Sequence, residues 1–232
     1  MIETEDVLLA SDGARRFDGY LARASGIRAP GVIVLHDMFG LNEPIRAIAD
    51  GLAARGFVAL VPNLFWRAAI AAAIPYDDDK HAIAWERLNA FDLDTGARDI
   101  ANAASWLRTR ADVNGKIAAV GFCGGGRWAW LAAARAGVDA AAALYGLGIS
   151  QHLDELPRVT CPVQLHYGLR DQHVPQQEID KVAAGVQGRP GVTVFRYPEA
   201  GHSFANPVRP TFDPAAAALA FERIERMLSA LR

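Results

Sequence analysis

Short apolar segments alternate with amphipathic ones along nearly the whole chain. The β-rich segments are predicted as strands at Gly31–Asp37, Phe57–Asn63, Lys116–Phe122, Val138–Gly146, Pro162–Gly168 and Val192–Pro198. Segments with helical periodicity separate or follow them, at Glu43–Arg55, Thr95–Arg110, Gly125–Ala136, Gln176–Val186 and Pro214–Leu231. Strands that alternate with helices form a parallel sheet with helices on both faces. The sequence therefore predicts an α/β fold with a mostly parallel sheet, and residues 1–232 as one domain.

The segment Leu64–Asn89 departs from this regular alternation. It holds an alanine-rich run, the acidic run Asp77–Asp79 and one short amphipathic helix. Ligands bind outside the carboxyl ends of the strands in open α/β sheets. We therefore expect this segment to cross over the sheet and roof a pocket. Three adjacent carboxylates before a helix favour its N-terminus, so we expect no metal site there.

Composition and charge exclude several classes of protein. Hydrophobic residues make up 51% and charged residues 22% of the chain, as in ordinary soluble globular proteins. The formal net charge is −2 and no basic block occurs, so we expect no nucleic-acid partner. The N-terminal segment lacks the features of a secretory signal, and no apolar tract approaches the roughly 20 residues that cross a bilayer. These features predict a cytoplasmic protein without a membrane partner.

A cysteine occupies the most distinctive turn of the sequence. Gly121, Cys123 and Gly125 form a Gly-x-Cys-x-Gly motif between a predicted strand and a predicted helix, as in a nucleophile elbow. Glycines are needed there because the turn is tight, and the N-terminus of a helix favours a thiolate. A buried structural cysteine is the alternative. The second cysteine, Cys161, lies in a different context, and a cytosolic protein would keep both thiols reduced.

The same turn also fits a dinucleotide-binding fingerprint. Gly124, Gly126 and Ala129 match G-x-G-x-x-A. That fingerprint belongs in the first strand–helix–strand unit, with an acidic residue at the end of the next strand, whereas here Asp139 lies at that strand's beginning. We therefore expect no cofactor.

Two later loops supply the partners that a cysteine nucleophile needs. Asp171 follows the predicted strand Pro162–Gly168, and His202 follows the predicted strand Val192–Pro198. His202 can take and return a proton, while Asp171 can hold the imidazole in the useful tautomer. His36 and His166 lie near or within buried strands, where we expect core imidazoles.

These residues stand in motifs that resemble the dienelactone hydrolase family, the cysteine branch of the α/β-hydrolases. The matching motifs are HDMFGLN, VPNLFWR, AFDLDTG, GFCGGG, GLRDQHVP and EAGHSFAN, which are spread over nearly the whole chain. The resemblance implies a Cys123–His202–Asp171 triad, with the backbone N–H groups of Met38 and Gly124 as the oxyanion hole. It also implies a small monomer without a cofactor.

The resemblance also implies residues that contact the thiol and the substrate. Asp37 stands where the family has a glutamate that contacts the resting thiol; the alternative role for Asp37 is to accept hydrogen bonds from its own loop. Where family members hold a substrate carboxylate with arginines, this chain has His81 and Asn206, and we expect Arg67, Arg127 or Arg209 to be the candidates for replacing them. The aromatic residues expected to line the pocket are Phe39, Trp66, Trp85, Tyr145 and Phe204.

The predicted reaction is hydrolysis of a lactone or an activated ester through a thioester on Cys123. The predicted partner is therefore a small-molecule lactone or ester. Two alternatives use the same scaffold differently: a redox-sensing thiol, because an accessible thiolate also reacts with peroxide, and a ligand-binding protein without turnover.

Overall fold

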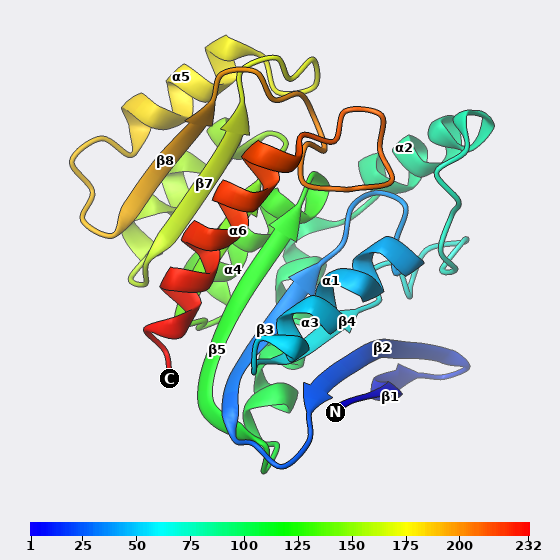
Figure 1. Ribbon diagram of the computed structural model, residues 1–232. Coiled ribbons are helices and arrows are strands. Elements are labelled where there is room, and N and C mark those ends of the chain that lie inside the picture. Colours follow the sequence, from blue (N-terminus) through cyan, green and yellow to red (C-terminus); the bar gives the residue numbers. More distant parts are fainter.

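The computed structural model describes residues 1–232, apart from the side chain of Asp78. Within these residues, eight strands form one sheet in the order β1-β2-β4-β3-β5-β6-β7-β8, with helices on both faces (Figure 1). The strands are β1 (Ile2–Asp12), β2 (Arg15–Ala24), β3 (Ala29–Leu35), β4 (Val58–Pro62), β5 (Val113–Phe122), β6 (Ala140–Leu144), β7 (Val163–Gly168) and β8 (Val192–Tyr197). The helices are α1 (Glu43–Ala54), α2 (His81–Asn89), α3 (Leu93–Arg108), α4 (Gly124–Arg135), α5 (Gln176–Gly185) and α6 (Pro214–Ser229), with 3-10 helices η1 (Asp78–Lys80) and η2 (Ile149–Arg158).

The sheet confirms the predicted α/β class. Strands β3 to β8 run parallel, whereas β2 pairs antiparallel with both β1 and β4. Every strand and helix predicted from the periodicity is present, with ends shifted by a few residues. No helix among the described residues is long and apolar enough to span a bilayer.

The sequence pattern does not predict the hairpin of β1 and β2. Nearly every residue of β1 is exposed, so its side chains do not alternate between core and solvent. Charged side chains along this strand weaken the signal further, and one of them, Glu3, forms a 3.0 Å ion pair with Arg23 of β2. The 3-10 helix η2 was likewise not predicted, and Pro157 interrupts its sequence pattern.

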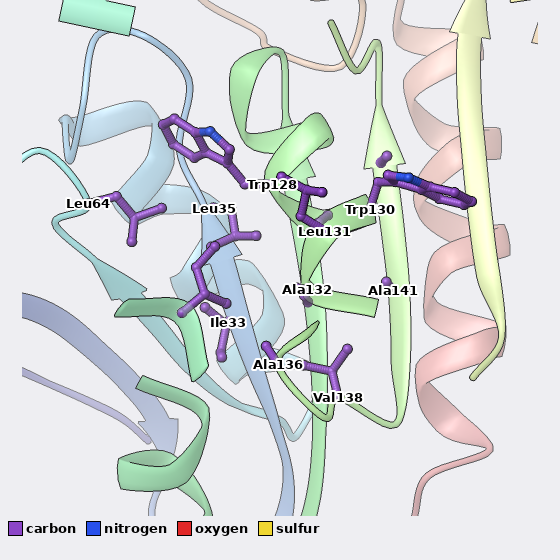
Figure 2. Packing of buried hydrophobic residues seen from close by; sticks show 14 of the residues in the cluster. Ile33, Leu35, Leu64, Trp128, Trp130, Leu131, Ala132, Ala136, Val138 and Ala141 are labelled. Carbon is purple, nitrogen blue, oxygen red and sulfur yellow. The ribbon is translucent and has the colours of Figure 1, made fainter. Parts of the chain in front are cut away.

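Two apolar clusters cover the two faces of the sheet. One cluster joins the sheet to α1 and α6, and the other joins it to α3, α4 and α5. Figure 2 shows part of the second cluster, in which Trp128 and Leu131 of α4 pack among Ile33 and Leu35 of β3. Both faces of the central strands are therefore buried, which explains their continuous apolar sequences.

The glycines around Cys123 allow β3, β5 and α4 to approach closely. A Cβ atom at Gly121 would lie 1.9 Å from the carbonyl oxygen of Gly125. A Cβ atom at Gly125 would lie 2.1 Å from the carbonyl oxygen of Leu35, at the end of β3. The steric need for these glycines is confirmed, and the resulting contact brings the loop after β3 to the N-terminus of α4.

The segment from Leu64 to Asn89 lies against this same loop. The backbone N–H of Ile74 donates to the carbonyl oxygen of Phe39 at 2.8 Å. In Figure 1, α2 lies at the end of the sheet where β3 and β5 terminate, beside the loop that connects β8 to α6. Residues from four separate parts of the chain therefore gather at the carboxyl edge of the sheet.

Candidate active site

Cys123 occupies a sharp turn between β5 and α4. Its backbone has φ 57° and ψ −118°, and its side chain is buried under the surrounding loops. The N–H of Cys123 donates to Leu144 O at 3.1 Å, and its carbonyl oxygen accepts hydrogen bonds from Gly126 and Leu147. These contacts hold the strained residue from both sides, as a nucleophile elbow requires.

Positive φ angles at residues other than glycine mark three loops at one edge of the sheet. Besides Cys123, the described chain has them at Tyr145 (φ 42°) and Ser203 (φ 61°). These residues follow β5, β6 and β8, respectively. Such conformations are costly and cluster at functional sites, so their coincidence indicates a site at this edge.

His202 and Asp171 form a direct pair on two neighbouring loops. The Nδ1 atom of His202 lies 2.8 Å from Oδ2 of Asp171. Oδ1 of Asp171 accepts hydrogen bonds from the backbone N–H groups of His173 and Val174 at 2.7 and 3.0 Å. The carboxylate is therefore fixed, and it orients the imidazole with Nδ1 protonated and Nε2 directed elsewhere.

The environment of His202 favours the imidazolium. Burial lowers the pKa of His202, but the thiolate charge of Cys123 and hydrogen bonds to Asp171 and Cys123 outweigh this effect and raise the pKa to about 10. Cys123 and His202 lie at the same edge of the sheet, because the N–H of Cys123 donates to Leu144 O and the ring of the next residue, Tyr145, lies 5.1 Å from that of His202. The structure therefore brings together the three residues predicted as a triad, although β5, β7 and β8 carry them separately.

Asp37 is held by groups other than the thiol. Its Oδ1 accepts from the N–H of Phe39 at 2.8 Å, and its Oδ2 accepts from the hydroxyl of Tyr76 at 2.8 Å. Burial raises the pKa of Asp37, while these hydrogen bonds and the charges of Arg209 and His202 oppose the rise. This arrangement favours the loop-holding role over a direct contact with Cys123.

Two backbone N–H groups near Cys123 have no acceptor within the described protein. They belong to Met38, in the loop after β3, and to Gly124, the first residue of α4. The loop of Met38 reaches Cys123 because Gly125 allows the end of β3 to contact α4. Two free N–H groups on adjoining segments suit an anionic oxygen that forms beside the thiol.

The predicted pocket residues form a chain of ring contacts that leads from His202. Tyr145 lies 5.1 Å from the His202 ring and 5.3 Å from the Phe204 ring, measured between centroids. His173 lies 4.8 Å from His202 and 5.7 Å from Trp85. The contacts thus gather aromatic side chains from the ends of β6 and β8, from the loop after β7, and from α2.

His81 and Phe39 lie together at another part of the same edge. Their ring centroids are 5.3 Å apart, and Phe39 also contacts Tyr76 at 4.6 Å. The Nε2 atom of His81 is buried and has no hydrogen-bond partner among the described groups. Asn206 differs, because its amide donates to the Tyr76 hydroxyl at 3.1 Å and accepts from the N–H of Val208.

Two of the expected contacts are wrong. Trp66 stacks on Phe17 and donates from its indole N–H to Asp99 at 2.9 Å, so it belongs to the core. Arg67 lies over the Trp66 ring and forms an ion pair with the same carboxylate. Residues that follow a strand can point to either face, and here both side chains turn toward α3.

The other two arginines form no direct ion pair with any described carboxylate. The guanidinium of Arg209 lies 5.6 Å from the Phe39 ring and 5.1 Å from the Tyr76 ring, and its charge affects the pKa values of Asp37 and His173. Arg127 is half-buried, its Nε has no partner, and burial lowers its pKa. Positive charge that takes part in no direct ion pair with a described carboxylate therefore lies beside the site.

Sequence reasoning missed Tyr76 and Arg87. Tyr76 supports Asp37 across 39 residues of sequence, and Arg87 contacts the carbonyl oxygen of Met38 across 49 residues. Neither residue stands in a local motif. One signal for Arg87 was available in the sequence: it is a charged residue at a position where the predicted helix faces the protein interior.

The described part of the chain contains neither a cluster of metal-ligating side chains nor a disulfide bond. No group of three or more histidine, cysteine, aspartate or glutamate side chains there could hold a metal ion. The acidic run Asp77–Asp79 includes Asp78, whose side chain lies outside this description. Both cysteines are free, and burial raises the pKa of Cys161 to about 11.

The chain is similar to several known proteins over most of its length. The model of the dienelactone hydrolase family matches residues 17–231. Carboxymethylenebutenolidase from Pseudomonas putida is 33% identical over 221 residues, covering 95% of this chain and 94% of that protein. Carboxymethylenebutenolidase 1 from Cupriavidus pinatubonensis is 30% identical over 233 residues, covering 99% of this chain and 98% of that protein. A dienelactone hydrolase-like promiscuous phosphotriesterase from metagenomic libraries has a crystal structure with a TM-score of 0.84 and 25% identity, covering 99% of this chain and 98% of that chain.

Proposed function

Because the chain belongs to the dienelactone hydrolase family, we propose that it opens a lactone or cleaves an activated ester through a thioester on Cys123. Its relatives include carboxymethylenebutenolidases, so the chain is a hydrolase of esters or lactones. The observation that carries the proposal is the conformation of Cys123. A strained residue at the N-terminus of α4, beside two N–H groups without protein acceptors, is suited to nucleophilic attack.

The first half of the reaction forms the thioester. The thiolate sulfur of Cys123 attacks the carbonyl carbon, and the electron pair of the carbonyl moves to its oxygen. The N–H groups of Met38 and Gly124 donate to this oxyanion. Collapse of the intermediate breaks the carbon–oxygen bond of the ester, and the leaving oxygen takes a proton from the His202 imidazolium, which leaves His202 neutral.

Water completes the reaction. Neutral His202 accepts a proton from water at Nε2 while the water oxygen attacks the thioester carbon, and Asp171 stabilises the resulting imidazolium through Nδ1. Collapse then breaks the carbon–sulfur bond and regenerates the thiolate. The net change is the addition of one water molecule, which converts a lactone into an open-chain acid.

We propose an anionic lactone as the preferred substrate. Arg209 lies over Phe39 and Tyr76 without a direct ion pair to any described carboxylate. A substrate carboxylate would supply that partner, and His81 Nε2 would supply a further polar contact. Sulfur also favours substrates whose leaving group is a stabilised enolate over unactivated alkyl esters.

The test compares the wild type with Cys123→Ala on a dienelactone and on a neutral nitrophenyl ester. Cys161→Ala is the matched control because that thiol is half-buried and has a raised pKa. We expect Cys123→Ala to lose both activities, Cys161→Ala to keep both, and mass spectrometry to detect an acyl group on Cys123 of the wild type. Turnover that survives in Cys123→Ala would refute the thioester route.

The same experiment separates the hydrolase from the redox-sensing and binding alternatives. A sensor would show stable, peroxide-driven oxidation of Cys123 without ester turnover. A binding protein would retain the lactone without acylation or turnover. Each of these results would replace the proposed reaction.

A further inference from the structure

Arg87 is an unusual cation because it is buried without a direct carboxylate partner among the described side chains. Only 7% of the residue is exposed. Its guanidinium donates to three backbone carbonyl oxygens: Met38 at 2.7 Å, Ala72 at 2.7 Å and Ile70 at 3.0 Å. A buried cation of this kind carries a large desolvation penalty that carbonyl dipoles offset only in part.

We propose that Arg87 is a positioning residue that holds the Met38 N–H in the orientation needed to receive the oxyanion. This inference rests on the proposed function, because it assigns the support for one donor of the proposed oxyanion hole. Arg87 reaches this loop from α2, which lies at the carboxyl edge of the sheet (Figure 1).

The hydrogen bonds of the two peptide groups that flank Met38 carry the inference. In the first group, the carbonyl oxygen of Asp37 accepts from Gly40 N at 3.2 Å and contacts Nδ1 of His36 at 2.8 Å. In the second, the carbonyl oxygen of Met38 accepts from Arg87, and the N–H of Phe39 donates to Oδ1 of Asp37 at 2.8 Å.

Three of the four polar groups in these two peptide planes are therefore engaged, and the Met38 N–H is left over. Rotation of either plane would break at least one of the existing hydrogen bonds. The free N–H is thus fixed in direction before any substrate binds, which is the condition for electrostatic stabilisation without reorganisation. Arg87 is the only one of these contacts that comes from outside the loop and its adjoining residue His36.

The charge of Arg87 acts in the same direction as its geometry. Burial lowers the pKa of Arg87 to about 10, so the guanidinium remains protonated near neutral pH. A cation bound to the Met38 carbonyl oxygen polarises the peptide group between Met38 and Phe39 and adds positive charge to the loop that carries the Met38 N–H. Its effect is greatest in the transition state and small in the ground state.

The test uses Arg87→Met, which keeps much of the length but has no donor, and Arg87→Lys, which keeps the charge and one donor nitrogen. Arg108→Met and Arg108→Lys are matched controls, because Arg108 also donates to two backbone carbonyl oxygens, those of Gly115 in β5 and Gly137. We expect Arg87→Met to lower kcat about 10- to 100-fold with little change in KM, and Arg87→Lys to fall between it and the wild type. The Arg108 variants should keep kcat.

An inhibitor pair distinguishes positioning from general support of the fold. Phenyl trifluoromethyl ketone forms a tetrahedral oxyanion adduct with a thiolate, whereas the corresponding alcohol binds without an adduct. The affinity for the ketone should fall by the same factor as kcat in Arg87→Met, and the affinity for the alcohol should not change. Equal losses for both inhibitors, or a change in KM alone, would overturn the inference.

Chemical rescue supplies a second readout. Arg87 lines a cavity of about 390 Å³ between α2, α3 and the residues after β4. Methylguanidinium should therefore enter Arg87→Ala and restore part of kcat, but should not affect Arg108→Ala. If Arg87→Met and Arg87→Ala fail to fold, the comparison of Arg87→Lys with Arg108→Lys decides, and equal kcat values would refute the role.

The experiments distinguish a failure of the positioning role of Arg87 from a failure of the proposed function. If the wild type forms no ketone adduct on Cys123 and no acyl enzyme, the thioester mechanism is wrong whatever Arg87 does. If the wild type forms both and the Arg87 variants behave like the Arg108 variants, only the positioning role is wrong.

Discussion

The hydroxyl of Tyr76 donates a 2.8 Å hydrogen bond to Oδ2 of Asp37, and it accepts a 3.1 Å hydrogen bond from the amide of Asn206. This chain of contacts links the loop after β3, the segment before α2 and the loop that carries His202. Because the N–H of Phe39 occupies the other oxygen of Asp37, the carboxylate is engaged on both sides. The amide of Asn206 is thus engaged with Tyr76. Among the described groups, His81 Nε2 has no hydrogen-bond partner and the guanidinium of Arg209 has no direct ion pair.

Tyr76→Phe should change the pH dependence of the reaction. The Tyr76 hydroxyl helps to keep the pKa of Asp37 down against the effect of burial, so its loss should raise that pKa further. Protonation of Asp37 then begins at higher pH, and we expect the acid limb of kcat/KM to move upward. Tyr20→Phe is the matched control, because Tyr20 donates to Asp50 at 2.7 Å away from the site. An acid limb that does not move would show that Asp37 has no influence on the reaction.

Arg209→Gln should separate anionic from neutral substrates. If Arg209 binds a substrate carboxylate, its loss removes a charge-assisted hydrogen bond worth about 1.5–3 kcal/mol, or about 10- to 100-fold in kcat/KM for the anionic lactone. Turnover of a neutral nitrophenyl ester should be nearly unchanged. Arg223→Gln is the control, since Arg223 lies 4.2 Å from the Phe195 ring in a comparable cation–π contact. Equal losses on both substrates would contradict the anion-binding role.

His36 should make the fold sensitive to mild acid. Its Nε2 accepts from the N–H of Leu64 at 3.1 Å, so the ring must be neutral, and Nδ1 donates to Asp37 O. Burial lowers its folded-state pKa from 6.5 to about 4, and between these values the unfolded chain binds a proton that the folded chain does not. The contribution of neutral His36 to the free energy of unfolding is therefore fully present above pH 6.5, and it is lost as the pH falls toward 4.

The corresponding measurement is urea unfolding of the wild type and His36→Gln from neutral pH down to pH 4. The shift in pKa corresponds to about 3 kcal/mol, and the variant should lose that part of the acid dependence. His166, whose pKa burial lowers to about 3, should leave a residual dependence of the same sign in both proteins. Parallel curves for the two proteins would exclude His36 as the source.

Gly125→Ala and Gly51→Ala should have effects of opposite sign on stability. A Cβ atom at Gly125 would lie 2.1 Å from Leu35 O and 2.5 Å from His36 O, so the end of β3 or the start of α4 must move. At Gly51, within α1, the nearest atom beyond the local helix backbone is Nη1 of Arg55 at 3.4 Å, and the change should stabilise the helix by about 0.5–1 kcal/mol. Thermal unfolding of both variants tests the pair. A Gly125→Ala protein as stable as the wild type would contradict the close approach of β3 and α4.

Local patterns in the sequence account for most of the elements and for the nucleophile. The apolar runs of the central strands indicate burial on both faces, and the structure buries all of β3 and β4. The Gly-x-Cys-x-Gly motif predicts the elbow because its steric demands fall on residues only two positions from Cys123. The order of Cys123, Asp171 and His202 could be proposed because each follows a strand, and parallel strands end at the same edge.

The exposed hairpin of β1 and β2 and the supports of the site could not be predicted in this way. β1 has no buried face to impose a period of two on its sequence, so its strand character follows from pairing with β2. The direction of a side chain after a strand also depends on what packs above it, which is why Trp66 and Arg67 turn toward Asp99 instead of the pocket.

The sequence alone thus determined the α/β class, the order of the elements and the residues able to perform the chemistry, because periodicity and turn sterics act over a few residues. Only the tertiary structure decided that Tyr76 holds Asp37, that Arg87 holds Met38 and that Arg209 remains without a direct ion pair among the described carboxylates. These relationships depend on hydrogen bonds and desolvation between segments far apart in the chain. Folding brings such segments together, and no local pattern records which of them will meet.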